Sequence, residues 1–264
     1  MVKEFAAHKY WAVILGGSSG LGLAAAKKLS AHGMNLCLIH RNTRSELTAI
    51  DDAFSKIKQE GTEVLSYNID VIKPESRATV INGLMAQIGE GKVRCLLHSI
   101  AKGNLKAMTS EEGSVLEKDD FLITFQNMAL ILYEWTKHLK EAHLFAEDAR
   151  IISFTSEGSG KAIRNYAAVS SAKAALEAIT RSIALEFAPY GIRANCIQAG
   201  VTNTRSLKMI PGNEKIIKQT INRNPYQRLT TPEDVANVVY LLCKDEAAWI
   251  NGSIIPVDGG EHIS

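Results

Sequence analysis

The hydrophobic pattern of this chain alternates between short apolar runs and longer segments of helical periodicity. The apolar runs occupy 11–15, 35–39, 63–67, 94–98, 150–154, 192–197 and 253–257. Segments in which apolar residues recur with a helical period lie between them, at about 21–32, 45–60, 75–89, 119–142, 166–188 and 232–243. This alternation predicts a doubly wound α/β fold, with a parallel sheet of about seven strands and helices on both faces.

The length of 264 residues suits a single α/β domain, 1–264. One irregular interval, at about 200–225, interrupts the last crossover between strands. Insertions at the carboxyl ends of strands commonly form lids or substrate walls. We therefore expect a substrate loop at about 202–222, mobile without ligand.

Composition narrows the class of protein. Hydrophobic residues make up 46% and charged residues 22%, which is ordinary for a globular enzyme, and the formal charge of +2 gives no reason to expect nucleic acid. The four cysteines have no metal-ligand spacing, so reduced buried thiols and no metal site are expected. The first apolar run is too short for a signal peptide or a membrane span. These features predict a cytoplasmic protein without a membrane partner.

Three glycines follow the first apolar run and open the first helical segment. Gly16, Gly20 and Gly22 allow a tight turn whose backbone approaches a pyrophosphate at the helix N-terminus. In this strand-turn-helix context they predict dinucleotide binding and a Rossmann fold. The predicted contacts in the turn are Gly16, Ser18, Ser19, Gly20, Leu21 and Gly22.

The end of the second apolar run bears on the choice of cofactor. An NAD enzyme usually has an acidic residue there for the ribose 2′-hydroxyl, whereas this chain has His40 and Arg41, with Arg44 nearby. A guanidinium suits a 2′-phosphate, so we predict NADPH; a solvated basic loop is the alternative. Asp70, after the third run, is placed to meet the adenine ring, although a turn-forming aspartate explains it nearly as well.

Ser156, Tyr166 and Lys173 stand between the 150–154 run and the long helical segment that follows. Seven residues of helix turn through about 700°, so Tyr166 and Lys173 share a face. Spacing alone is also compatible with a packed tyrosine and a surface lysine.

Taken together, the chain resembles the short-chain dehydrogenase/reductase superfamily over nearly its whole length. The resemblance rests on the glycine turn, Asp70, the serine before the Tyr/Lys helix, "IRANCIQAG" at 192–200 and "VDGG" at 257–260. Two departures are Leu15, where threonine is usual, and "HSIA" at 98–101, where N-N-A-G is usual. The further cofactor contacts that the resemblance implies are Asp70, Val71, Ser99, Ile100, Ala101, Lys173, Gly200, Val201 and Thr204.

The position of the tyrosine points to a subfamily. Most members carry it four residues before the lysine, where this chain has Val169. The spacing Tyr166-x6-Lys173, with "HSIA" upstream, resembles the enoyl-acyl-carrier-protein reductases of bacterial fatty acid synthesis. Ser156 stands where many of them have a second tyrosine, as in an NADPH-using branch of that group.

The shifted tyrosine has a chemical reason. In enoyl thioester reduction hydride goes to C3 while charge develops on the thioester oxygen at C1, so the donor must stand further off than in ketone reduction. Three residues move it by about 4–5 Å along a helix. The resemblance implies that Lys173 binds the nicotinamide ribose and favours phenolate character in Tyr166.

Two further residues have open roles. Asn127 matches the asparagine that the superfamily places behind the lysine, but a helix-packing amide explains it about as well. Ser156 orients the thioester or simply ends the strand.

The leading hypothesis is therefore an NADPH-dependent enoyl thioester reductase, acting on substrates carried by acyl carrier protein. A 3-oxoacyl or other carbonyl reductase with a relocated tyrosine is the first alternative, and a non-catalytic NADP(H)-binding protein is the second. The helices at 119–142 and 166–188 resemble those forming four-helix interfaces in superfamily tetramers, so we expect a homotetramer.

Overall fold

Seven strands form one parallel sheet in the order β3-β2-β1-β4-β5-β6-β7. The computed structural model describes residues 3–59, 61–111, 113–210 and 212–264. The strands are β1 (Tyr10–Leu15), β2 (Asn35–His40), β3 (Val64–Asn68), β4 (Lys92–His98), β5 (Phe145–Thr155), β6 (Ile192–Ala199) and β7 (Ile254–Val257). The predicted doubly wound fold with seven parallel strands is confirmed.

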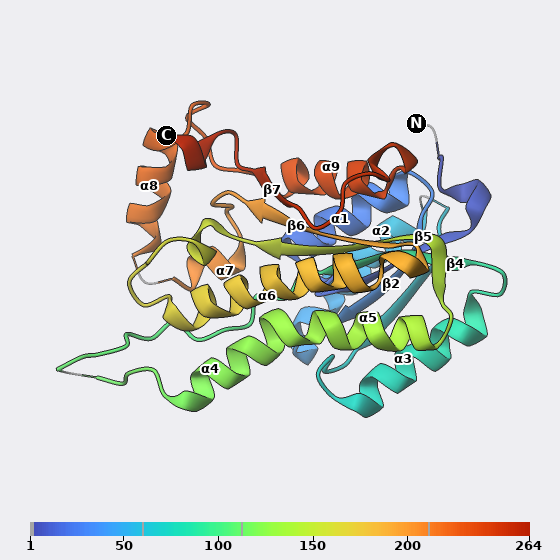
Figure 1. Cartoon of the computed structure of the whole chain (residues 1–264), viewed down its shortest axis with the longest axis horizontal. Coiled ribbons are helices and arrows are strands. Elements are labelled where there is room, and N and C mark those ends of the chain that lie inside the picture. The colour runs from blue at the N-terminus through green and yellow to red at the C-terminus, as the bar shows by residue number, and fades with distance from the viewer. Residues whose placement is uncertain (1–2, 60, 112, 211) are drawn as a thin grey trace.

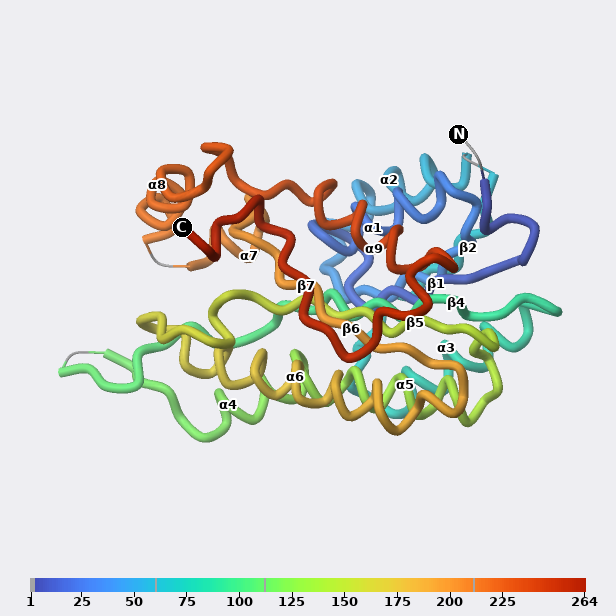
Figure 2. The backbone as a smooth tube through the Cα atoms, turned by 45° about the horizontal axis from the view of Figure 1, so that its top comes forward, coloured from blue at the N-terminus to red at the C-terminus, as the bar shows by residue number. Residues whose placement is uncertain are grey.

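Helices cover both faces of the sheet (Figures 1 and 2). One layer contains α1 (Gly20–Ala31), α2 (Leu47–Gln59) and α9 (Pro232–Cys243), and the other contains α3 (Pro74–Gln87), α4 (Lys118–Phe125), α5 (Ile131–Glu141) and α6 (Ala167–Glu186). The central strands are buried on both faces. Along β1, Ile14 packs into the first layer while Val13 and Leu15 pack into the second, as the period of two in a strand requires.

Two predicted segments differ from the structure in detail. The helix expected at 119–142 is divided, because the turn Gln126–Leu130 between α4 and α5 is π-helical. The interval at 200–225 contains α7 (Arg205–Lys208) and α8 (Asn213–Arg223), which lie beyond the carboxyl end of β6. Residue 60 of the predicted helix 45–60, and residue 211 of the predicted loop 202–222, lie outside the described residues.

Buried arginines hold the amino-terminal end of the sheet. Arg94 Nε donates to the Cys243 carbonyl at 3.0 Å and Arg150 Nε donates to the Leu242 carbonyl at 2.9 Å, so both bind the last turn of α9. Each also forms an ion pair with Asp148. Because these charges are paired and bonded to otherwise unsatisfied helix carbonyls, their burial is tolerated. The opposite end of the sheet remains open for loops.

Among the described residues, no helix combines the length and the apolar character needed to cross a bilayer.

Candidate functional site

The glycine turn packs against neighbouring backbone. A β-carbon at Gly22 would stand 2.2 Å from the Gly16 carbonyl oxygen, and one at Gly16 would stand 2.5 Å from the Ser99 carbonyl oxygen. Gly16 also has a positive φ of 89°. Only glycine fits both positions, because side chains would collide with backbone that cannot move away. The turn therefore lies directly beside the Ser99 segment that follows β4.

Thr204 closes the other side of this turn. A β-carbon on Gly20 would lie 3.6 Å from Thr204 Cγ2, in ordinary contact. Thr204 is the N-cap of α7, and its hydroxyl accepts a hydrogen bond from the Leu207 amide at 3.4 Å. The structure thus brings together the glycine turn, the segment after β4 and the segment after β6. The sequence predicted a cofactor contact in each of these three segments.

The end of β2 is arranged differently from the prediction. His40 is buried, its Nδ1 is 3.1 Å from Asn42 Oδ1, and its Nε2 is 3.3 Å from Ser66 Oγ. Burial lowers its pKa, so the ring is neutral at pH 7. Both nitrogens are occupied by the protein, and the assignment of His40 to the cofactor has no geometric support. The ring braces Asn42, which in turn accepts a hydrogen bond from Ser18 Oγ at 2.9 Å.

Arg41 and Asp70 form one unit. Arg41 NH1 donates to Asp70 Oδ2 at 2.6 Å, and Asp70 Oδ1 accepts from the Ile72 amide at 3.2 Å. The Arg41 side chain is 62% exposed, so the rest of its guanidinium fork is free to meet an anion. Asp70 performs the turn-forming role that the sequence left open, and it also orients Arg41.

The backbones near Asp70 and at Gly200 are also fixed. The Val71 carbonyl accepts a hydrogen bond from Trp135 Nε1 at 3.1 Å. A β-carbon at Gly200 would lie 2.4 Å from Thr230 Oγ1, so no larger residue fits there. The Val201 amide donates to Glu261 Oε2 at 3.3 Å.

Lys173 lies at the centre of the site. It is 7% exposed, and its Nζ donates to the Phe154 carbonyl at 2.7 Å. Burial lowers its pKa to about 8, against the opposing effect of the negative charges that Cys196 and Glu177 can carry. A surface lysine is thereby excluded. The ammonium is charged at neutral pH and stands at the carboxyl end of β5.

Tyr166 is the N-cap of α6, so it stands at the start of the helix whose second turn bears Lys173. Burial raises the pKa of its phenol, while the nearby Ser156 hydroxyl acts in the opposite direction. Ser156 Oγ is buried and has no hydrogen-bond partner among the described residues. A buried hydroxyl without a partner is costly, and its position beside the phenol marks it as available for a ligand.

Val169 occupies the position where most superfamily members have tyrosine. It is 3% exposed and forms a buried cluster with Met128 and Ala172, against which Leu105 packs. Gly103 closes the same cluster, since a β-carbon there would stand 3.0 Å from Val169 Cγ2. A phenol at 169 would overpack this cluster. Position 169, in the first turn of α6, thus has no space for a tyrosine.

Asn127 lies in the π-helical turn, but its side chain points to its own helix. Asn127 Nδ2 donates to the Ile123 carbonyl at 2.7 Å, which is the helix-packing role. The backbone carbonyl oxygen of Asn127 is 3.0 Å from His98 Nε2. Burial and the charge of Lys173 lower the pKa of His98 to about 3, so its ring is neutral. Nε2 is therefore the protonated nitrogen of His98. The catalytic assignment of the Asn127 amide has no geometric support.

Sequence reasoning missed two residues near the site. Ser170 lies on α6 between Tyr166 and Lys173, and its hydroxyl is buried without a partner in the described chain. Arg205 forms an ion pair with Glu46, joining α7 to the segment after β2. A helical wheel drawn from Tyr166 would have found Ser170, whereas Arg205 gives no local signal.

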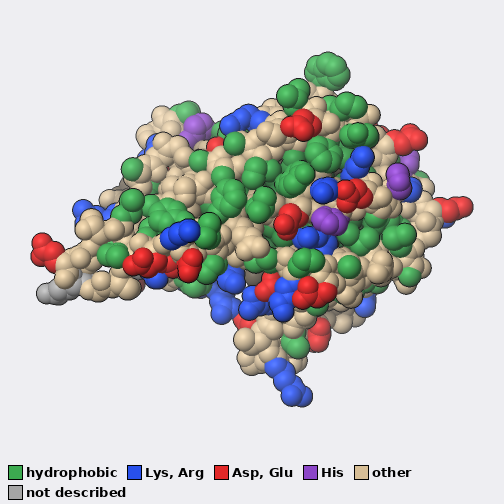
Figure 3. Space-filling model, turned by 60° about the horizontal axis from the view of Figure 1, so that its bottom comes forward, with side chains coloured by type: hydrophobic (Ala, Val, Ile, Leu, Met, Phe, Trp, Pro, Cys, Tyr) green, Lys and Arg blue, Asp and Glu red, His purple; other side chains and the backbone are tan. Residues whose placement is uncertain are grey.

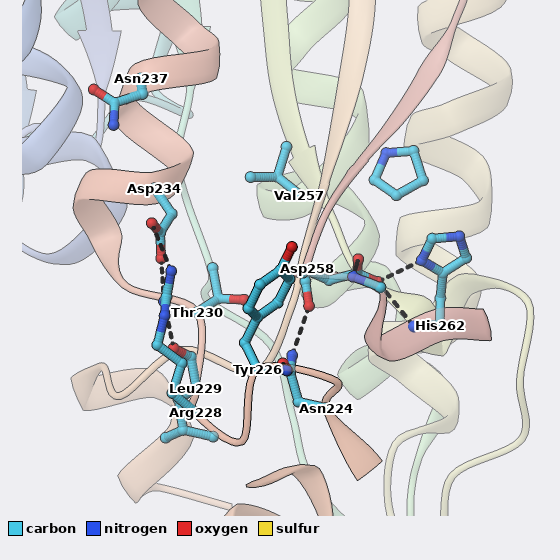
Figure 4. A pocket seen from close by; sticks show the side chains of 13 residues that line it. Asn224, Tyr226, Arg228, Leu229, Thr230, Asp234, Asn237, Val257, Asp258 and His262 are labelled. Carbon is cyan, nitrogen blue, oxygen red and sulfur yellow. Dashed lines mark hydrogen bonds and ion pairs between the residues drawn. The ribbon is translucent and has the colours of Figure 1, made fainter. Parts of the chain in front are cut away.

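A separate cavity of about 420 Å³ lies between β7, the start of α9 and the chain after α8 (Figure 4). Residues that line it include Asn224, Tyr226, Arg228, Asp234 and Asp258. None of the residues predicted for cofactor or catalysis lines it. The predicted site is instead the set of loops at the carboxyl ends of β1, β4, β5 and β6.

Comparisons with known proteins identify the family of the chain. The family model described as enoyl-(acyl carrier protein) reductase matches residues 16–262. The enoyl-[acyl-carrier-protein] reductase [NADPH] FabI of Staphylococcus aureus is 31% identical over 250 residues, covering 92% of this chain and 91% of that protein. The human mitochondrial dehydrogenase/reductase SDR family member 2 is 27% identical over 248 residues, covering 94% and 85%.

Among solved structures, the NADH-dependent enoyl-[acyl-carrier-protein] reductase of Aquifex aeolicus superposes with a TM-score of 0.81 at 24% identity. That comparison covers 97% of both chains and shows the fold. The matched family model extends over nearly the whole chain, and it includes the glycine turn, Tyr166 and Lys173. The chain therefore belongs to the family that the enoyl-(acyl carrier protein) reductase model describes, and it is an oxidoreductase of the short-chain dehydrogenase/reductase superfamily.

Proposed function

We propose that the protein is an NADPH-dependent reductase of trans-2-enoyl thioesters, acting on acyl-carrier-protein substrates in fatty acid synthesis. One observation carries the proposal. Tyr166 stands at the start of α6, one turn further from Lys173 than in a ketone reductase, while Val169 is packed in an apolar cluster that leaves no space for the usual tyrosine. The available acid is thus the one whose distance suits an oxyanion two carbons from the site of hydride addition.

The residues present fit a nicotinamide dinucleotide. The turn at Gly16 and Gly22 excludes side chains and leaves its backbone amides near the start of α1, where a pyrophosphate is favoured. Arg41, exposed and oriented by Asp70, would take the 2′-phosphate of NADPH. Lys173 would hold the nicotinamide ribose, and Thr204 would meet the carboxamide. When bound, the cofactor supplies the hydride that adds to C3 of the enoyl group.

The protein's own contribution is electrostatic. The Tyr166 hydroxyl donates a hydrogen bond to the thioester oxygen as negative charge develops there. Its pKa is raised by burial, so the phenol is protonated at neutral pH and can act as donor. The nearby ammonium of Lys173 favours the phenolate character that grows as the proton is shared. The Ser156 hydroxyl, which has no hydrogen-bond partner within the described part of the chain, contributes a second contact for the same oxygen.

The surroundings of position 169 and of Lys173 also bear on the two alternative functions. A 3-oxoacyl or other carbonyl reductase would need its acid close to the carbon that accepts hydride, and position 169 cannot supply one. A non-catalytic NADP(H)-binding protein would have no need of a buried Lys173 with a lowered pKa on the helix that Tyr166 caps. Both alternatives are decided by the same assay.

The expected homotetramer has a candidate surface. Figure 3 shows hydrophobic side chains gathered on the face formed by the helices below the sheet in Figure 1. On α4 and α5, Leu122 is 52%, Ile123 is 44% and Tyr133 is 40% exposed. Exposed apolar residues of this size on adjacent helices favour burial against a second copy, as in a four-helix interface.

The substrate assignment is tested by following NADPH oxidation with matched thioesters. We expect turnover with crotonyl thioesters and at most trace turnover with 3-oxobutyryl thioesters, on acyl carrier protein and on coenzyme A. Preference for the carrier protein would show as a lower KM. Turnover of the 3-oxoacyl substrate alone would replace the proposal with the first alternative, and no turnover of either would favour the second.

Replacing Tyr166 with Phe tests the oxyanion donor. We expect kcat for crotonyl thioester to fall by roughly 10²-fold while the fold and the NADPH Kd are kept, because only the transition state loses a contact. Tyr190→Phe, beyond the other end of α6, is the control and should leave kcat unchanged. Near-normal turnover in Tyr166→Phe would transfer the role to Ser156 or Ser170.

Replacing Arg41 with Ala tests cofactor choice. NADPH affinity should fall by roughly tenfold or more while NADH affinity changes little, because only the 2′-phosphate loses a charged partner. Arg44→Ala is the matched comparison on the same loop, and both Kd values are measured by fluorescence titration. An equal loss for the two cofactors in Arg41→Ala would contradict the assignment.

The pH dependence follows from Lys173. Its pKa is lowered from 10.5 to about 8, so the cation is present below pH 8 and is lost as pH rises through that value. The raised pKa of Tyr166 keeps the phenol protonated over this range. We therefore expect kcat/KM for NADPH to be flat near pH 7 and to fall above about pH 8. In Lys173→Arg the residual activity should lose this alkaline limb; an unchanged limb would place the titrating group elsewhere.

A further inference from the structure

Three segments that are distant in sequence meet at one arginine. Arg223 is the last residue of α8, and its NH2 donates to Glu261 Oε1 at 2.6 Å and to Glu157 Oε2 at 3.0 Å. Glu157 begins the 3-10 turn η4 (Glu157–Ser159), and Glu261 begins the 3-10 turn η7 (Glu261–Ile263). A single guanidinium thus joins α8 to the loop that follows β5. We call α8 the substrate wall, because it lies in the interval expected to border the substrate.

Glu261 is more deeply buried than Arg223. It is 3% exposed, and besides Arg223 it accepts hydrogen bonds from the Val201 amide at 3.3 Å and from Thr220 Oγ1 at 3.2 Å. Val201 belongs to the segment after β6 that borders the cofactor site. A buried carboxylate is stable only when such partners replace water, so Glu261 and Arg223 depend on each other.

The turn that bears Glu261 is itself fixed. Figure 4 shows Asp258 bonded to His262, whose amide and Nδ1 lie 3.0 Å and 2.7 Å from Asp258 Oδ2. Asn224, next to Arg223, donates from Nδ2 to the Asp258 carbonyl at 2.8 Å. The end of α8 and the turn η7 therefore form one rigid support.

The other end of the contact reaches the catalytic tyrosine. A β-carbon at Gly158 would stand 2.7 Å from Tyr166 Cε1, so the backbone of η4 packs directly on the phenol ring. Ser156, whose buried hydroxyl has no hydrogen-bond partner among the described residues, immediately precedes Glu157. A movement of Glu157 would consequently shift both groups that face the thioester oxygen.

We propose that Arg223 is a positioning residue that couples the substrate wall α8 to the oxyanion donors through Glu157, with Glu261 holding its guanidinium in place. Enoyl reduction requires Tyr166 to stand at a set distance from the cofactor, and a misplacement of about 1 Å can cost roughly 10²-fold in rate. Arg223 makes this distance depend on the presence of α8 over the site. The inference rests on the proposed function for its substrate, but not for its geometry.

A double-mutant cycle tests the coupling. Arg223→Gln and Glu157→Gln should each lower kcat with crotonyl thioester by roughly tenfold, with the KM for NADPH changed by less than about twofold. The double variant should lose no more than the stronger single variant, because the contact between Arg223 and Glu157 is already absent in either single variant. Arg228→Gln is the matched control, because Arg228 lies five residues after Arg223. It breaks only the exposed ion pair with Asp234 and should leave kcat unchanged. Losses that multiply, or a single variant with wild-type kcat, would overturn the proposal.

Hydrogen exchange supplies a readout that needs no turnover. The Ser159 amide donates to the Ser156 carbonyl at 3.0 Å and the Gly160 amide donates to the Glu157 carbonyl at 3.2 Å, so both report the order of η4. In Arg223→Gln these amides should exchange faster, although the substitution lies on α8, and in Arg228→Gln they should not. Unchanged exchange in Arg223→Gln, or faster exchange without loss of kcat, would overturn the coupling. Reduction of a 3-oxoacyl thioester instead would remove the proposed function, and the same cycle would then be measured on that substrate.

Discussion

The candidate site depends on the parallel pairing of β1, β4, β5 and β6. In the register of these strands Leu15 pairs with His98, His98 with Ser153, and Phe154 with Ile197. The glycine turn, the Ser99 segment, Ser156 and the Gly200 segment therefore begin at the same edge of the sheet. Parallel pairing makes this inevitable, because every carboxyl end points the same way and each following loop must start there.

Within this frame, packing decides which chemistry one helix can support. Val169 is enclosed by small and apolar neighbours, and this enclosure excludes a phenol at position 169 in the first turn of α6. Tyr166 at the N-cap remains exposed to the site, while Lys173 is anchored on the Phe154 carbonyl. A displacement of about one helical turn thus changes the distance between acid and hydride acceptor without changing the fold.

Charge completes the arrangement from outside the helix. Burial lowers the pKa of Lys173 to about 8, so nearby charges can change the protonation state of its amine close to neutral pH. The contacts of Arg223 with Glu157 and Glu261 connect α8 to the turn η4, which packs against the Tyr166 ring. The oxyanion donor Tyr166 and the cation Lys173 both belong to α6, and the ion pairs of Arg223 connect α8 to the turn that packs against Tyr166.

Local patterns in the sequence determined the strands, the main helices, the glycine turn and the shared face of Tyr166 and Lys173, because hydrophobic period, glycine stereochemistry and helix geometry act within a few residues. Tertiary structure alone decided the rest. It turned His40 inward and joined Arg41 to Asp70. It also gave α8 its contact with η4, although the interval had been read as an irregular loop. These outcomes depend on which distant side chains share a desolvated space, and a local pattern carries no information about that.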